Sequence, residues 1–273
     1  MTDARRARPD DERALIQSVS RAARILKTLG SDTSRLGVTE LAARLDLKKA
    51  TVYGLLRTLE AHQLVEQDVE TGKYRLGPAL LQLGNAYLDN HELRARSLLW
   101  AESLATRAGE AVHVGVLTGP SVLIVHHVFR PDDSVQILEV GASIPWHACA
   151  LGKAIVAHVG PAEQRELLAG PLSKLTGRTL VDPAALGREL GRVRREGLAT
   201  ERHEAIVGEA GIAAPLFGNR GRVVGAIGVS GPVEHLLPDG PPATTVTAVK
   251  EVARGLSREL GGGRAATAPG VGA

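Results

Sequence analysis

The chain has 273 residues, of which 44% are hydrophobic and 23% are charged, and its formal net charge is +3. This length favours two domains, the one cysteine excludes an internal disulfide, and an aromatic content of 3% disfavours stacking on unpaired bases. No run of about 18 apolar residues occurs and residues 1–13 are polar and charged, so we expect a soluble, cytoplasmic protein without a membrane span.

The N-terminal third begins with a polar arm and continues with helical patterns. We expect residues 1–14 to be disordered and a first helix to run from an N-cap at Ser18 to a stop at Gly30. A second helix is predicted over 38–45, with Thr39 as its N-cap. Residues 47–49 then form a turn.

The next helix, predicted over 50–60, has an apolar and a polar face. Its apolar residues follow the i, i+3, i+4, i+7 spacing of one buried stripe, at Val52, Leu55, Leu56 and Leu59. The other face carries hydroxyl groups and cations that suit a helix in the major groove of DNA. This pair of helices predicts a helix-turn-helix; the alternative is an ordinary helical hairpin in a core.

A short hairpin follows the two helices. Extended runs over 64–66 and 73–76 are joined through 70–72, as in the wing of a winged helix-turn-helix, which would then cover 15–77. The partner of such a domain is double-stranded DNA. The residues predicted to contact DNA are Lys48, Lys49, Ala50, Thr51, Tyr53, Gly54, Arg57, Lys73 and Arg75.

Residues 78–91 are predicted to form a linker helix. Apolar residues lie around much of its surface, so we expect a second copy of the chain to cover part of it. The alternative is that this helix packs only on its own domain.

Residues 92–260 have the pattern of a second domain of the α+β class on a mostly antiparallel sheet. Strands are predicted over 111–117, 122–129, 135–140, 211–217 and 223–229. Helices are predicted up to Ala108 and over 151–158, 161–168, 183–196 (capped by Asp182) and 244–260. The Gly/Ala-rich tail, 261–273, is expected to be disordered.

Several motifs resemble those of the IclR-type transcriptional regulators. They lie, in order, at 18–22, 40–42, Thr51 with 55–59, 74–77, 151–154, 211–215 and 225–231. The resemblance implies a winged helix N-terminal domain, a GAF-like effector-binding domain, and homodimers or homotetramers on operator DNA. Residues 89–96 and 126–133 also resemble the glycerol operon regulators of this family. Ala50 and Gly54 depart from the serine and arginine usual there, so the operator sequence cannot be transferred.

The same resemblance implies an effector pocket around the loop 146–153. The residues assigned to it are His147, Cys149, Ala150, Leu151, Glu201, Gly211, Gly228 and Ser230. The start of a helix favours an anion, Ser230 is expected to donate to a phosphate or carboxylate oxygen, and Glu201 to accept from hydroxyl groups. A phosphorylated polyol such as glycerol 3-phosphate would satisfy both ends. Lys153 is read either as part of this site or as a structural ion pair.

The expected function is a transcriptional regulator, a repressor, whose operator affinity is controlled by a small anionic metabolite of glycerol metabolism. The alternatives are regulation of another catabolic operon by a small carboxylate, and activation. An enzyme would need a thiolate pair of Cys149 and His147, or Ser230 as nucleophile, and neither spacing fits. A purely architectural DNA-binding protein would not need so long a second domain.

No cofactor and no metal are predicted. The chain has nine histidines, but His126 and His127 are adjacent on a predicted strand and point to opposite faces. No histidine pair at i, i+4 on a helix offers zinc ligands. Cys149 is most simply read as a small buried residue.

Overall fold

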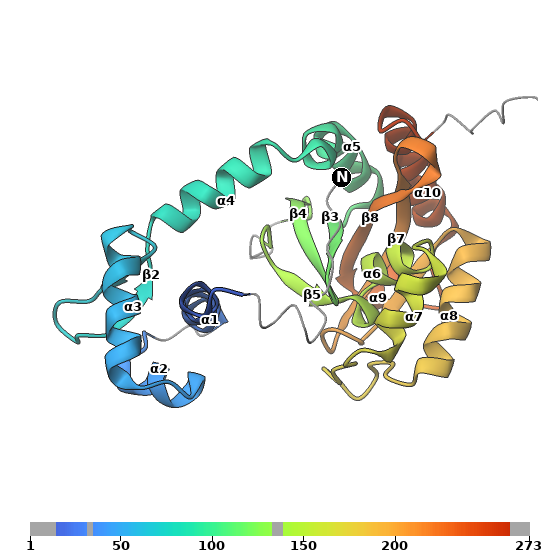
Figure 1. Ribbon diagram of the computed structural model, residues 1–273. Coiled ribbons are helices and arrows are strands. Elements are labelled where there is room, and N and C mark those ends of the chain that lie inside the picture. Colours follow the sequence, from blue (N-terminus) through green and yellow to red (C-terminus); the bar gives the residue numbers. More distant parts are fainter. Residues whose placement is uncertain (1–14, 32–34, 133–138, 263–273) are drawn as a thin grey trace, which may run out of the picture. The chain divides into compact units, whose positions relative to one another are not determined.

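The computed structural model describes residues 15–31, 35–132 and 139–262, which belong to two compact units that divide between Asn90 and His91 (Figure 1). The arm predicted over 1–14 and residues 263–273 of the predicted tail lie outside the described residues.

The first unit is helical with one small hairpin. Its elements are α1 (Gln17–Ser31), α2 (Val38–Leu45), α3 (Lys49–Ala61), β1 (Val65–Gln67), β2 (Tyr74–Leu76) and α4 (Ala79–Asp89). The three helices α1 to α3 bury a common core that includes Ile25, Leu41 and Leu56, and the antiparallel hairpin closes it with Val65 and Tyr74. The predicted helical N-terminal domain is therefore confirmed.

Two predicted helix caps are wrong. Gly37, and not Thr39, is the N-cap of α2, because its backbone N–H donates to Oε2 of Glu40 at 2.6 Å and so satisfies the start of the helix. Helix α1 starts one residue before Ser18 and continues through Gly30, since Ser20 N–H already donates to the carbonyl of Ile16. Hydrogen bonds of backbone N–H groups, to a side chain in α2 and to a carbonyl in α1, thus place the starts of both helices.

Helix α4 has exposed apolar side chains. None of its residues, all of which are described, is buried. Leu81, Leu83 and Tyr87 are exposed by 69%, 61% and 49%. An amphipathic helix with this much exposed apolar surface is typical of an interaction surface.

The second unit is an α+β domain, as predicted. Its helices are α5 (Glu92–Ala108), α6 (Ala150–Val156), α7 (Pro161–Ala169), α8 (Pro183–Glu196), α9 (Val233–Leu236) and α10 (Ala243–Glu259). Its strands are β3 (Ala111–Thr118), β4 (Ser121–Val128), β5 (Ser143–Pro145), β6 (Ala199–Arg202), β7 (Glu209–Phe217) and β8 (Val223–Pro232).

The strands form one sheet in the order β5-β4-β3-β8-β7-β6, with every neighbouring pair antiparallel. Helices α5 and α10 pack against β3 and β7 respectively, whereas α6 and α8 share a core with Ala199 and Ala213 (Figure 1). Asp182 caps α8 as predicted, by accepting from Ala185 N–H at 2.7 Å.

Two short strands, β5 and β6, were not predicted. Most of the strand expected over 135–140 lies outside the described residues, and its last two residues, Glu139 and Val140, are not in a strand. Among the described residues, no helix is long and apolar enough to span a bilayer.

Candidate DNA-binding surface and effector cavity

Helix α3 separates a buried stripe from a polar face. Val52, Leu56 and Leu59 are buried. The residues predicted to contact DNA lie on the remaining surface: Lys48, Lys49, Ala50, Tyr53, Gly54, Arg57 and Arg75 are exposed, and Thr51 and Lys73 are half-buried. The helix therefore presents to solvent the hydroxyl groups and cations that could meet a groove.

The cations of this unit differ in their partners. On the hairpin, Arg75 pairs with Glu66, and Lys73 Nζ lies 3.6 Å from Oε2 of Glu40. Within the described part of the chain, Lys48, Lys49 and Arg57 have no carboxylate partner. The cations of the turn and of α3 can therefore bind DNA phosphates without first breaking an ion pair with a carboxylate.

The second unit contains a cavity of about 360 Å³ on the sheet face that carries α6. Its floor follows from the strand register, because cross-strand partners point to the same face. One row across the sheet consists of Glu201, Gly211, Ser230 and Ala111, and the next consists of Ala199, Ala213, Gly228, His113 and His127. Small residues occupy the middle of both rows, Gly211 and Ser230 in the first and Ala213 and Gly228 in the second.

A side chain on the two floor glycines would meet neighbouring atoms, closely at Gly228 and less closely at Gly211. A Cβ on Gly228 would lie 2.4 Å from the Ile212 carbonyl oxygen and 2.6 Å from Cβ of Ala213. A Cβ on Gly211 would lie 3.3 Å from Cβ of Ala150 on α6. The backbone itself therefore forms part of the cavity surface.

Glu201 forms one side of the cavity and belongs to a buried polar network. Its Oε2 accepts from Glu204 N–H at 3.1 Å, and Lys153 Nζ lies 2.5 Å from Oε1 of Glu204. Burial raises the pKa of Glu201 to about 7, against the opposing hydrogen bond from Glu204. Because Lys153 is buried in this pair and does not line the cavity, its reading as a structural ion pair is confirmed.

The opposite side of the cavity holds two stacked histidines. The rings of His113 and His127 lie 4.4 Å apart, and Ser230 Oγ lies 3.0 Å from Nδ1 of His113. Burial lowers the pKa of His127 to about 4, so that this ring is neutral at pH 7. Glu139, which lies 2.9 Å from His113 Nε2, and Arg130 complete this side.

The predicted effector residues are largely brought together here. The cavity is lined by Cys149, Ala150, Leu151, Glu201, Gly211, Gly228 and Ser230. His147 is not among the lining residues: it is buried, and its Nε2 lies 3.0 Å from the Ser173 carbonyl oxygen. Sequence reasoning missed His113, His127, Arg130, Glu139 and Glu209, because their neighbourhood to Ser230 and Gly211 depends on strand register.

Cys149 is a helix cap in a buried position. Its Sγ accepts from Gly152 N–H at 3.4 Å, at the start of α6. Burial raises the pKa of the thiol to about 12, so a thiolate is not available near neutral pH. This agrees with the reading of Cys149 as a small buried residue.

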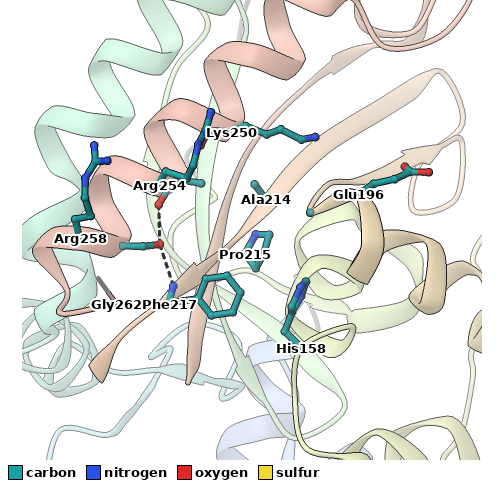
Figure 2. A pocket seen from close by; sticks show the side chains of 12 residues that line it. His158, Glu196, Ala214, Pro215, Phe217, Lys250, Arg254, Arg258 and Gly262 are labelled. Carbon is teal, nitrogen blue, oxygen red and sulfur yellow. Dashed lines mark hydrogen bonds between the residues drawn. The ribbon is translucent and has the colours of Figure 1, made fainter. Parts of the chain in front are cut away.

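A second groove, of about 460 Å³, lies where β7 continues beyond its pairing with β6, beside α10 (Figure 2). Pro215 and Phe217 form its apolar floor, and Lys250, Arg254 and Arg258 come from α10. The Ser257 hydroxyl joins α10 to β7, because it accepts from Phe217 N–H and donates to the Ala253 carbonyl. None of the predicted effector residues lines this groove.

A helix-turn-helix unit joined to an α+β unit with a cavity defines a transcriptional regulator with a ligand-binding domain. The chain belongs to the IclR family. The model of the IclR helix-turn-helix domain matches residues 18–69, and that of the bacterial transcriptional regulator IclR C-terminal domain matches residues 85–258. The chain is thus a DNA-binding transcriptional regulator and not an enzyme.

Similar proteins cover almost the whole chain. A glycerol operon regulatory protein from Streptomyces griseus is 51% identical over 91% of this chain and 98% of its own length, and one from Streptomyces coelicolor is 47% identical over the same shares. Among solved structures, an IclR-type regulator from Silicibacter has a TM-score of 0.76 at 28% identity, covering 93% of this chain and 100% of its own. An IclR homologue from Microbacterium hydrocarbonoxydans, complexed with 4-hydroxybenzoate, has a TM-score of 0.73 at 26% identity, covering 89% and 99%.

Proposed function

We propose that this protein represses a glycerol operon and that glycerol 3-phosphate, bound in the cavity between α6 and the sheet, controls its affinity for the operator. The observation that carries the proposal is the cavity itself, about 360 Å³ in volume and lined by polar groups from β3, β6 and β8. A cavity of this size suits a small metabolite. The names of the relatives at 51% and 47% identity support glycerol metabolism.

The proposed operator surface consists of Lys48, Lys49, Ala50, Thr51, Tyr53, Gly54, Arg57, Lys73 and Arg75. Exposed cations without carboxylate partners among the described residues support the role of the turn and α3. The hairpin cations, which pair with Glu66 and Glu40, are proposed to contact the backbone beside the groove.

We propose a homodimer in which α4 of one copy covers α4 of another. The support is the exposure of Leu81, Leu83 and Tyr87. A dimer also suits an operator with two half-sites. Sedimentation of the protein and of a Leu81→Glu/Leu83→Glu variant tests this: the variant should be monomeric at micromolar concentration, and an unchanged mass would contradict the proposal.

The test of the effector has two stages. Footprinting of genomic DNA with the purified protein first identifies the bound sites. Binding to such a site is then titrated with glycerol 3-phosphate, glycerol, pyruvate and 4-hydroxybenzoate. A change in affinity with glycerol 3-phosphate supports the proposal, and none with this compound rejects it.

The second candidate is regulation by a small carboxylate. It is favoured by the relative that was crystallised with 4-hydroxybenzoate, although that protein is only 26% identical. A response to pyruvate or 4-hydroxybenzoate in the same titration would select it. Repression is separated from activation by deleting the gene: expression from the bound promoter without glycerol should rise, whereas an activator would let it fall.

A further inference from the structure

The second groove, beside α10, carries a row of cations (Figure 2). Lys250, Arg254 and Arg258 recur every fourth residue of α10, so they lie along one face of that helix. Within residues 15–31, 35–132 and 139–262, no carboxylate forms an ion pair with any of the three. Glu196, the one acidic residue on the described lining, is paired with Arg192 at 2.8 Å. The groove therefore presents positive charge that a bound anion could neutralise.

The floor of the same groove is apolar and aromatic. It is formed by Pro215 and Phe217 of β7. The His158 ring stands edge-on to the Phe217 ring, with the ring centroids 5.2 Å apart. Burial lowers the pKa of His158 below its usual range, so this ring is uncharged at pH 7. Such a floor suits the apolar or aromatic body of a ligand.

The strand edge beside the groove is poorly suited to a further strand. Strand β6 pairs with β7 only as far as Ala213, and beyond this residue β7 is paired on one side alone. Pro215 has no N–H, and Phe217 N–H already donates to Ser257 Oγ at 3.0 Å. An extended peptide would find few donors along this edge. The groove is therefore better matched to a compact molecule.

We propose that the second groove is a further ligand site, and that its ligand is a small carboxylate with an aromatic or branched apolar body. The carboxylate accepts hydrogen bonds from Lys250 and Arg254, and the body lies on Pro215 and Phe217. The volume of about 460 Å³ is in the range of small-molecule sites. The groove shares no lining residue with the cavity under α6. The proposal goes beyond control by glycerol 3-phosphate and does not depend on it.

The ligand class is tested with a probe and two analogues. Calorimetry compares 3-phenylpropanoate with 3-phenylpropan-1-ol, which lacks the charge, and with propanoate, which lacks the ring. The alcohol should bind about tenfold more weakly than 3-phenylpropanoate, because it loses the charge-assisted hydrogen bonds. Propanoate should also bind more weakly, because it buries less apolar surface. Equal binding of the acid and the alcohol would overturn the proposal.

The two phenylalanines of the chain report where the probe binds. Phe217 lies in the groove, whereas the Phe129 ring lies 4.8 Å from the ring of His127, which lines the cavity. In protein labelled with ring-¹³C phenylalanine, Phe217→Leu assigns the two sets of signals. Addition of 3-phenylpropanoate should shift the Phe217 signals. A shift of the Phe129 signals alone, or of neither set, would contradict the proposed site.

The cations are tested by removing their charge. Lys250→Gln/Arg254→Gln should weaken 3-phenylpropanoate binding by about tenfold. Arg188→Gln, at an exposed position on α8 that does not line the groove, is the matched control and should bind as the wild type does. Unchanged affinity in the double variant would reject the role of α10.

Two other occupants of the groove are separated by the free protein. Residues 263–273 follow the lining residue Gly262, but they contain Arg264 and no acidic side chain, so the charge of the groove does not favour them. In a chain that ends at Gly262 the Phe217 signals should stay unchanged, and they should not move on dilution. A change on truncation would assign the groove to this segment, and a change on dilution would assign it to a second copy of the chain. Either result would overturn the proposal.

Discussion

Glu201 carries a carboxyl group in a place where its ionisation is unfavourable. The residue is 7% exposed, and its pKa of about 7 compares with an ordinary value of 4.5 for a glutamate side chain. Between these two values the folded protein binds more protons at this site than the unfolded chain. Stability contributed by the neutral group is therefore present at low pH and is lost as the pH rises through about 7.

We expect Glu201→Gln to reduce this loss. The amide keeps the acceptor for Glu204 N–H but does not ionise, so the variant should gain stability relative to the wild type between pH 5 and pH 8.5, by up to about 3 kcal/mol. Urea unfolding at both pH values measures it. Glu163→Gln, at an exposed position on α7, is the control. A pH-independent difference between variant and wild type would contradict the assignment.

Gly54 lowers the stability of the helix in which it lies, because a glycine in a helix interior loses more backbone entropy on folding than an alanine. A Cβ on Gly54, in the middle of α3, would meet nothing within 4 Å. Gly54→Ala should therefore stabilise the protein by about 0.5–1 kcal/mol, through the lower backbone entropy of the unfolded chain. Gly228→Ala, which would clash with β7, should destabilise it by about 1–3 kcal/mol. Thermal unfolding of both variants gives the signs, and a destabilised Gly54→Ala would reject the argument.

The polar face of α3 is expected to supply phosphate contacts. Arg57→Ala and Lys49→Ala should each weaken operator binding, by roughly tenfold near 0.1 M salt, and lower the slope of log K against log salt by about one unit. Fluorescence anisotropy at several salt concentrations measures both quantities. Arg165→Ala on α7 serves as a control cation. Unchanged binding in both α3 variants would mean that another surface meets the DNA.

Elements with a clear hydrophobic periodicity could be predicted from the sequence, whereas those that depend on pairing with another strand could not. The apolar spacing of α3 and the Asp182–Pro183 start of α8 located these helices. Strands β5 and β6 have three and four residues, too few for a period to stand out, and exist because β4 and β7 offer them partners. The N-cap of α2 was missed because the side chain of Glu40 caps it from inside the helix.

The candidate site was predicted through resemblance more than through spacing. Seven of the eight assigned residues line one cavity. His147 does not, and His113 does, although a bare sequence gives no reason to prefer the second. Only the register between β3 and β8 places His113 opposite Gly228 and next to Ser230. A single sequence holds no record of that pairing.

At the scale of the whole molecule, ligand binding and operator binding must be energetically coupled if the ligand controls the affinity for the operator. Thermodynamic linkage requires that this coupling be reciprocal. If glycerol 3-phosphate weakens operator binding by a given factor, saturating operator DNA should weaken glycerol 3-phosphate binding by the same factor. Anisotropy and calorimetry under one set of conditions supply the two numbers, and unequal factors would show that a further binding event intervenes.

The sheet of the second unit suggests where the coupling between the two binding events would begin. His127 lines the cavity, and its neighbour on β4, His126, faces the other way, where the charges of Arg94 and Glu102 on α5 act on it. Helix α5 starts two residues after Asn90. A ligand on the cavity floor thus contacts the same strands on which α5 packs, and α5 is the helix that follows the DNA-binding unit in the chain. The effect of the ligand then has to cross only one sheet, and adjacent residues of one strand reach both of its faces.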